Sequence, residues 1–386
     1  MAAQGAGDAW TIRRVLDWSV GYLTRKGDEH ARLSAEWLLT AACGISRVEV
    51  YTSFDKPLEP DELARMHAML ERRAAGEPLQ YVVGSTGFRT IEVACEPGVL
   101  IPRPETELLV GHVLDWLDRE VLGGAPARER AQIPWNAEVE EALAADRAAA
   151  AAARAERDGE GETDEGAAGD GAGEKPAASD AAAVPAASDG EASAPDASAE
   201  KPAEPVAPRV ARVLEVGCGT GCISLSLAAE RPGRVRCVAT DVEPRAVALA
   251  ERNREALGIS PEACDLRLGN LVAPLDRERE WGSFDVLVSN PPYVPTAVMA
   301  QLPREVAAFE PALALDGGAD GLAVFRRLVN AAPHMLRPGG LLACELHETC
   351  LDAAADLVRA QGGWASVAVE RDLARRPRYL LAQRRA

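Results

Sequence analysis

Hydrophobic residues follow two different spacings in this chain of 386 residues. Near the N-terminus they recur every three or four positions, which is the spacing of an amphipathic helix. Gly44 would end the second of the three helices that we expect there, with Asp28 as its N-cap, and Pro60-Asp61 would start the third. The apolar faces are Ile12, Val15, Leu16 and Leu23; Ala31, Ala35, Leu38, Leu39 and Ala42; and Leu63, Met66, Leu70 and Ala74. This part of the chain predicts a small helical domain.

From residue 209 onward, short apolar runs alternate with longer segments of helical spacing. Strand–helix alternation predicts a parallel, doubly wound sheet with helices on both faces, an α/β fold. Two strands at the C-terminal end have no helix between them, so they should form an antiparallel hairpin at one edge, as Gly84–Val93 should between the domains. The expected strands are 212–216, 236–241, 265–269, 284–289, 341–346, 365–371 and 378–383, and the expected helices are 220–230, 244–257, 322–336 and 349–361.

Composition sets one segment apart from both patterns. Residues 136–208 hold 18 acidic and 5 basic residues, so they carry −13 of the net charge of −18, and they contain few aliphatic residues other than Ala. Such a segment cannot bury enough apolar surface to offset its ordering entropy, which predicts a disordered acidic linker. A tail that mimics nucleic acid or recruits a basic partner is the alternative reading.

The rest of the chain carries a charge of only −5, and this argues against a duplex-binding protein, which would show a basic face. The 8 cysteines form no C-x-x-C pair, and the 5 histidines are scattered, so we expect no metal site. Reduced thiols, no signal-peptide pattern and no membrane-spanning apolar run predict a cytoplasmic protein that does not contact membranes.

A glycine-rich loop follows the first strand of the α/β region. Its residues are Gly217-Cys218-Gly219-Thr220-Gly221, and Asp241 ends the next strand about 20 residues later. Glycines let a ligand approach the N–H groups at a helix start, and an acid at that distance can bind a ribose diol. The G-x-G-x-G spacing departs from the dinucleotide fingerprint and favours S-adenosylmethionine, which has no pyrophosphate. A plain strand-to-helix turn, with Asp241 capping the next helix, is the structural alternative.

The tetrapeptide Asn290-Pro291-Pro292-Tyr293 ends another strand of the same sheet. Prolines cannot donate to the sheet ladder, so the chain should leave the sheet as a rigid loop. The Asn290 side chain and the Pro291 carbonyl are then two acceptors for the two hydrogens of a planar NH2 group. The motif predicts a clamp that orients an amino or amide nitrogen toward a methyl donor.

Several blocks together resemble the bacterial release factor glutamine methyltransferases, the PrmC/HemK family. They cover roughly residues 8–120 and 209–386, and they are Glu77–Tyr81, Leu100–Glu107, Asn290–Tyr293, Glu310-Pro311 and Leu315–Leu322. The resemblance implies a Rossmann-like, class I S-adenosylmethionine-dependent methyltransferase domain at 209–386. We divide the rest of the chain into a helical, substrate-docking domain at 1–83, a hairpin connector and start of the catalytic domain at 84–135, and the disordered acidic insert at 136–208. A packing module without a docking role is the alternative reading of the helical domain.

The family's activity is methylation of N5 of the glutamine in the Gly-Gly-Gln motif of peptide chain release factors, in translation termination. By position, the resemblance assigns S-adenosylmethionine to residues 217–221, Asp241, Asn270, Leu271 and Asn290. It assigns the glutamine to residues 290–293, with Arg103 and Glu105 in the site wall. We expect a monomer whose partner is the release factor, without direct nucleic-acid binding.

Three departures from the family pattern stand out. The acidic insert lies between the domains, so it leaves the predicted donor and glutamine sites unaffected. Leu271 stands where relatives have an aromatic residue beside the adenine, so a stacking contact is not expected from the residue type. Residues 345–348 replace a glycine-containing segment, and we expect His347 there to be a surface residue without a catalytic role.

Two other functions remain open at this point. A nucleic-acid amino-methyltransferase acting on adenine N6 or guanine N2 would use the same loop on a flipped base, and would require a basic channel. A non-catalytic module that only binds a release factor would be expected to lose its cofactor residues, yet Gly217, Gly219, Gly221, Asp241 and Asn290 are all present.

Overall fold

The computed structural model of the chain describes residues 9–123 and 209–386. The expected acidic linker at 136–208 and the last part of the expected connector at 84–135 lie outside these residues. Among the described residues, no helix has the length and apolar character needed to cross a membrane.

Five helices form the N-terminal region: α1 (Ile12–Arg25), α2 (Ala31–Cys43), α3 (Arg47–Thr52), α4 (Pro60–Ala74) and α5 (Leu79–Val83). The three helices expected from the sequence are α1, α2 and α4. Their apolar faces meet in one core that includes Ile12, Leu16, Leu38, Leu39, Met66 and Leu70. The helices α3 and α5 have only 6 and 5 residues, too few for a helical spacing to become visible in the sequence.

The predicted ends of α2 are half right. Gly44 ends the helix in a left-handed conformation with a φ of 64°, as expected for a C-terminal glycine. The N-cap, however, is His30, so the assignment of Asp28 was wrong. The Asp28 carboxylate instead accepts hydrogen bonds from the backbone N–H of His30 and the hydroxyl of Ser34, so it stabilises the turn before the helix.

A short hairpin and a long helix follow. Strands β1 (Ser85–Phe88) and β2 (Ile91–Ala94) pair antiparallel, as the sequence predicts. Helix α6 (Pro104–Glu120) starts with Pro104 in its first turn, where the missing N–H has no consequence.

The main sheet has seven strands in the order β5-β4-β3-β6-β7-β9-β8. All are parallel except β9, which pairs antiparallel with both β7 and β8. The predicted C-terminal hairpin is therefore present at one edge of the sheet. The strands are β3 (Ala211–Val216), β4 (Val235–Asp241), β5 (Cys264–Leu268), β6 (Phe284–Ser289), β7 (Leu336–Glu345), β8 (Trp364–Arg371) and β9 (Pro377–Arg384). Strand β7 starts five residues before its predicted start, because Pro338, Gly339 and Gly340 hide its first half.

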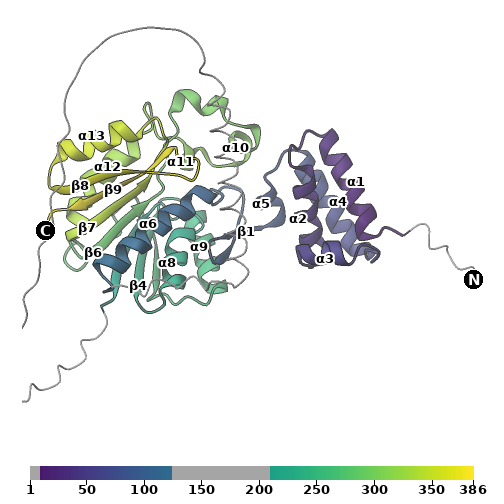
Figure 1. The fold of residues 1–386 in the computed structure, drawn as a ribbon, viewed down its shortest axis with the longest axis horizontal. Coiled ribbons are helices and arrows are strands. Elements are labelled where there is room, and N and C mark those ends of the chain that lie inside the picture. Colours follow the sequence, from purple (N-terminus) through teal and green to yellow (C-terminus); the bar gives the residue numbers. More distant parts are fainter. Residues whose placement is uncertain (1–8, 124–208) are drawn as a thin grey trace, which may run out of the picture. The chain divides into compact units, whose positions relative to one another are not determined.

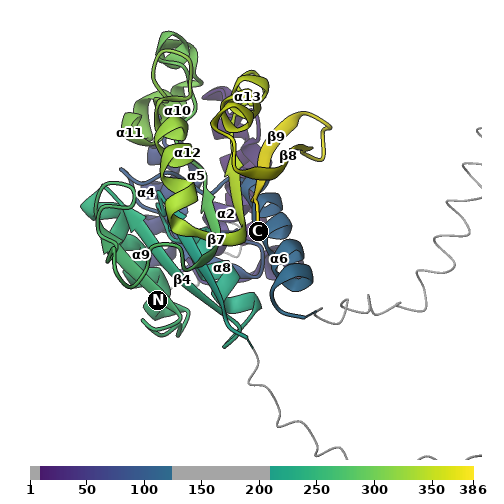
Figure 2. The ribbon, with the colours of Figure 1, turned by 90° about the vertical axis from the view of Figure 1, so that its left-hand side faces the viewer.

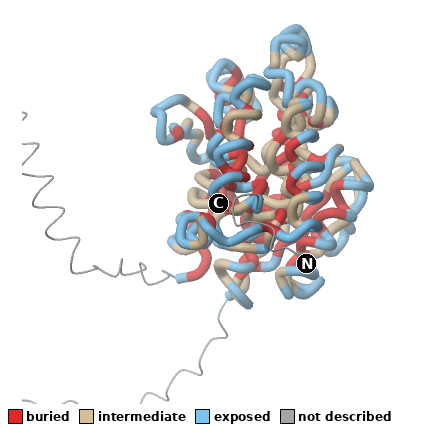
Figure 3. The backbone as a smooth tube through the Cα atoms, turned by 90° about the vertical axis from the view of Figure 1, so that its right-hand side faces the viewer, coloured by how far each residue is buried: buried red, intermediate tan, exposed pale blue. Residues whose placement is uncertain are grey.

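Helices cover both faces of this sheet, which confirms the doubly wound α/β fold (Figures 1 and 2). One face carries α6, α8 (Cys222–Glu230) and α9 (Pro244–Ala256), and the other carries α12 (Ala323–Met335) and α13 (Leu351–Gln361). Between β6 and α12 the chain forms η1 (Thr296–Gln301), α10 (Arg304–Phe309) and α11 (Ala312–Leu315). The central strands are buried on both sides, whereas turns at the periphery are exposed (Figure 3).

Candidate active site

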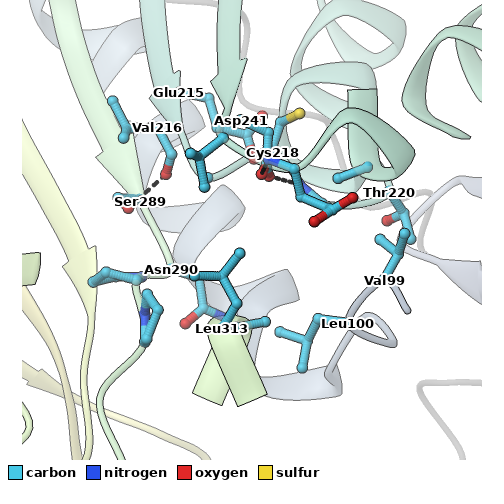
Figure 4. A pocket seen from close by; sticks show the side chains of 18 of the residues that line it. Val99, Leu100, Glu215, Val216, Cys218, Thr220, Asp241, Ser289, Asn290 and Leu313 are labelled. Carbon is cyan, nitrogen blue, oxygen red and sulfur yellow. Dashed lines mark hydrogen bonds between the residues drawn. The ribbon is translucent and has the colours of Figure 1, made fainter. Parts of the chain in front are cut away.

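A cavity of about 280 Å³ opens at the carboxyl ends of β3, β4 and β6. Ligands of open α/β sheets bind at this edge, where successive connections leave a crevice. In Figure 4 the end of β3 and Asp241 form one side of the cavity, and Asn290 and Leu313 lie across from them. The lining includes the glycine loop 217–220, Asp241, Asn270, Leu271, Asn290, Pro291, Pro292, Arg103 and Thr106. The structure therefore brings most of the predicted site residues together.

The glycine loop turns the chain from β3 into α8. Gly217, Gly219 and Gly221 all have positive φ, and Gly221 at 81° is the N-cap of α8. A Cβ at Gly221 would lie 3.0 Å from a methyl of Leu225 and 3.1 Å from Cβ of Ala250. Both the backbone conformation and the packing therefore require glycine there. Cys218 and Thr220, which the resemblance assigned to the donor, are almost fully buried in this loop.

Asp241 ties this loop to the end of β4. Its Oδ2 accepts a hydrogen bond of 2.9 Å from the N–H of Gly219, and its Oδ1 accepts one of 2.9 Å from the N–H of Glu243. Burial raises the pKa of Asp241, and these hydrogen bonds oppose that rise. Asp241 is not the N-cap of α9, because Glu243 occupies that position and its side chain accepts from Arg245. A carboxylate has about four lone-pair sites, so Asp241 can still bind ligand hydroxyls.

Glu215 lies beneath the glycine loop near the end of β3, with no solvent exposure. Its Oε2 accepts the N–H of Ser224 at 3.0 Å, and its Oε1 has no hydrogen-bond partner among the described residues. Burial raises the pKa of Glu215 to about 8. The residue also lines the cavity. A buried acceptor without a partner at a cavity wall fits a ligand that brings a cationic N–H group.

Asn270 and Leu271 follow β5 and form another part of the wall. Leu271 has a positive φ of 52°, and its carbonyl accepts a hydrogen bond of 2.9 Å from the Thr240 hydroxyl. The Asn270 Oδ1 accepts from Arg327 at 2.8 Å. The side chain of Leu271 therefore offers an apolar surface to a ligand at a backbone position that the sheet holds in place.

The Asn290 loop leaves β6 opposite the glycine loop. The hydroxyl of Ser289 donates to the Val216 carbonyl at 2.6 Å, which joins the ends of β6 and β3. The Nδ2 of Asn290 donates to the Thr106 hydroxyl oxygen of α6 at 3.0 Å. Pro291 is buried, and both prolines line the cavity.

Three predicted site residues, Gly221, Tyr293 and Glu105, lie outside the residues that line the cavity. The Tyr293 hydroxyl points toward Glu345 of β7, with 3.4 Å between its oxygen and Oε1, and burial raises the pKa of this phenol. The Glu105 carboxylate lies 3.8 Å from Arg376. Arg103 does line the cavity, and it forms an ion pair with the buried Glu310. His347 is half-buried, its Nδ1 lies 2.9 Å from the Thr349 hydroxyl, and it is not part of the wall.

Thr106 and Glu345, which lie next to Asn290 in the structure, have no role in the sequence analysis. Thr106 is 3 % exposed and Glu345 is 1 % exposed, and the Thr106 hydroxyl donates to Glu345 Oε2 at 2.7 Å. They are 239 positions apart, so no local pattern could have linked them. Their nearness to Asn290 is visible only once α6 and β7 pack on the same side of the site.

The groups that line the cavity limit the classes of ligand that it can bind. Within residues 9–123 and 209–386, no three histidine, cysteine, aspartate or glutamate side chains are grouped so that they could hold a metal ion. The cavity instead combines exposed backbone at a helix start, an acid at a strand end, a buried carboxyl with a free oxygen and a carboxamide across from them. These groups fit a ligand with an amino group and adjacent hydroxyls, next to a second, planar polar group.

The N-terminal helical region and the α/β region each match the model of a known protein family. Residues 14–84 match the model of the PrmC N-terminal domain, and residues 202–305 match that of the methyltransferase small domain. The chain is 36 % identical to the release factor glutamine methyltransferase of Geobacter sulfurreducens over 88 % of this chain and 85 % of that protein. It is 32 % identical to that of Moorella thermoacetica, over 97 % and 99 % of the two chains, and 30 % identical to that of Rhodospirillum rubrum, over 100 % and 88 %. With this identity across nearly its whole length, the chain belongs to the family of release factor glutamine methyltransferases.

Proposed function

We propose that this protein transfers a methyl group from S-adenosylmethionine to N5 of the glutamine in the Gly-Gly-Gln motif of peptide chain release factors. One observation carries the proposal: the Asn290 loop and the glycine loop with Asp241 line a single cavity. A clamp for a planar amide therefore lies across from a site for an adenosyl donor. Membership of the family supports the release factor as the protein that presents this amide.

The donor side of the cavity would hold S-adenosylmethionine through main-chain and carboxyl groups. The glycine loop lets the donor lie close to the backbone at the start of α8, although most of its N–H groups already bond within the protein. Asp241 offers its remaining carboxylate lone pairs for the ribose hydroxyls. Glu215 offers its unpartnered Oε1 to the donor's amino group, while Asn270 and Leu271 flank the adenine. When bound, this donor supplies a methyl group that its sulfonium has already activated for transfer.

The acceptor side would orient the glutamine amide. The Oδ1 of Asn290 and the carbonyl of Pro291 each accept one N–H of the amide, so its nitrogen faces the donor side of the cavity. Pro291 and Pro292 have fixed φ angles, so the two acceptors cannot relax away from the substrate. An amide nitrogen is a poor nucleophile, and placement at about 3–3.5 Å from the reacting carbon can contribute about 7–11 kcal/mol of the barrier.

The reaction requires the nitrogen to gain a methyl group and lose one proton. A methylated amide that still holds both protons is very acidic, so water can accept the proton and no strong base is required. Neither histidine nor lysine occurs among the described residues that line the cavity, in agreement with this chemistry. We assign Tyr293 to the support of the loop from behind, because its hydroxyl points toward Glu345.

Methyl transfer from labelled donor tests this function. The substrates are a purified release factor, the same factor with its motif Gln→Ala, and bulk RNA or DNA. We expect label only in the unaltered release factor. Label in nucleic acid would favour the amino-methyltransferase alternative, and donor binding with no label anywhere would favour a binding module. Gel filtration of the free protein and of its mixture with release factor tests our expectation of a monomer that binds its substrate directly.

A further inference from the structure

A buried hydrogen-bonded chain lies behind Asn290. Asn290 Nδ2 donates to Thr106 Oγ1 at 3.0 Å, and Thr106 Oγ1 donates to Glu345 Oε2 at 2.7 Å. The Tyr293 hydroxyl approaches the other oxygen, Oε1, at 3.4 Å. The side chains of Asn290, Thr106 and Glu345 come from the end of β6, the first turn of α6 and the last residue of β7, respectively. Thr106 and Glu345 therefore form a support for the Asn290 carboxamide.

The direction of these hydrogen bonds decides which end of the Asn290 carboxamide faces the substrate. A threonine hydroxyl has a single hydrogen, and here it is given to Glu345. Thr106 Oγ1 is therefore left as an acceptor, and it takes a hydrogen from the NH2 end of Asn290. The oxygen of Asn290, which accepts no hydrogen bond from the described residues, is thereby free for a substrate N–H. Rotation of the carboxamide by 180° would place NH2 against NH2 and abolish the clamp.

We propose that Glu345 is a positioning residue, whose carboxylate acts through Thr106 to hold the Asn290 carboxamide with its oxygen toward the substrate amide. This inference rests on the proposed function, because it concerns how the same clamp is set. Glu345 itself does not touch the substrate, since it is 1 % exposed and lies outside the cavity lining.

The ionisation of Glu345 then controls the clamp. The pKa of Glu345 is raised to about 7, mainly by burial and to a smaller extent by the charge of Glu105 on α6. Hydrogen bonds from Thr106 and Tyr293 and the charge of Arg378 on β9 lower it. Tyr379 of β9 and Cys222 of α8 also face this carboxyl as neutral groups.

Protonation of Glu345 removes the fixed direction of the hydrogen bonds that join Glu345, Thr106 and Asn290. Below about pH 7 the Glu345 carboxyl holds a hydrogen of its own and can donate it to Thr106. Thr106 can then donate to the Asn290 carboxamide, which favours the flipped amide. Methyl transfer should therefore be fastest above this pKa, and kcat should fall as the pH drops through it.

Substitution of Glu345 tests this control. Glu345→Gln keeps the shape of the side chain but cannot ionise. We expect kcat at pH 8 to fall on the order of 10- to 100-fold, as for a misplaced catalytic geometry, with the donor Kd unchanged. The acid limb of the kcat profile near pH 7 should disappear. A wild-type kcat with its acid limb intact in this variant would overturn the proposal.

Two variants of Thr106 test the same proposal if Glu345→Gln does not fold. Thr106→Val keeps the shape and removes the hydroxyl, so kcat should fall about as far as in Glu345→Gln, whereas Thr106→Ser should recover most of the loss. Equal rates in the two variants would also overturn the proposal. If the wild-type protein methylates the release factor and these variants behave alike, only this inference fails. If the wild-type protein does not methylate it, the proposed function fails.

Discussion

The two sides of the cavity are built in different ways. The donor side is mostly main chain and comes from a short stretch of sequence, in which Gly219 and Asp241 are 22 positions apart. The acceptor side is a relay of side chains, in which Asn290 and Thr106 are 184 positions apart and Thr106 and Glu345 are 239. Backbone groups need only the correct turn, whereas a side-chain amide needs neighbours that fix its rotation.

The same difference appears in the two buried glutamates. Burial raises the pKa of both, to about 8 for Glu215 and to about 7 for Glu345. Glu215 keeps one oxygen without a partner at the cavity wall, while both oxygens of Glu345 face protein hydroxyls. We therefore assign the first carboxyl to the donor and the second to the support of Asn290. Substitutions on the two sides should therefore change different kinetic constants.

The largest effect should come from the clamp. We expect Asn290→Ala to lower kcat about 100- to 1,000-fold, the loss typical of one preorganised hydrogen-bonding group, with the donor Kd nearly unchanged. Asn270→Ala is the matched change on the donor side, and it should raise the donor Kd with a smaller effect on kcat. Steady-state kinetics on a release factor and donor titration calorimetry measure both. Wild-type kinetics in Asn290→Ala would contradict the assigned mechanism.

Glu215→Gln should act on donor binding. The change removes a charge-assisted hydrogen bond worth about 1.5–3 kcal/mol, so we expect the donor Kd to rise about 10- to 100-fold. The pKa of about 8 means that Glu215 is mostly neutral at pH 7 in the free protein. A cationic amino group favours its ionised form, so donor affinity should increase as the pH rises toward 8. Calorimetry from pH 6 to 9 should show this rise in the wild type and its absence in the variant.

Gly221→Ala should test how much the close packing around Gly221 adds to the backbone strain of a positive φ. The added methyl group would meet Leu225 and Ala250 at a φ of 81°, so we expect the free energy of unfolding to fall by about 1–3 kcal/mol and donor affinity to fall about tenfold. Gly233→Ala is the control, since its φ is 70° and no atom lies within 4 Å of the added Cβ. Urea unfolding of the two variants measures the difference. Equal losses would show that the contact at Gly221 has no effect.

The smallest effect should come from the acidic insert. Because its composition resembles a linker and the described site residues all lie outside it, replacing residues 137–207 by a short flexible segment should leave kcat and both binding constants unchanged. The methyl-transfer assay on the release factor is the measurement. A clear loss of activity would show that the insert contributes to substrate binding.

Much of the fold could be read from the sequence because its signals are local. The seven strands, four helices of the α/β region and three N-terminal helices were predicted from apolar spacing and from Gly and Pro at their ends. An error occurred where a side chain had two possible partners: Asp28 was assigned as the cap of α2, but the cap is His30. The alternative reading of Asp241 as the cap of α9 fails in the same way, because the cap is Glu243. An acid near a helix start can bond to several N–H groups, and only the path of the turn selects one.

From the residues alone we predicted the doubly wound sheet, the glycine loop and a proline-containing turn at the end of β6. These features depend on residues that are neighbours in the chain, and their backbone preferences act locally. The packing of distant segments places Thr106 and Glu345 behind Asn290, leaves one oxygen of Glu215 without a partner among the described residues, and holds Tyr293 and Glu105 outside the cavity wall. No local pattern could predict these features, because hydrogen-bond partners and burial depend on segments far apart in the chain, and burial in turn raises the pKa of each carboxyl.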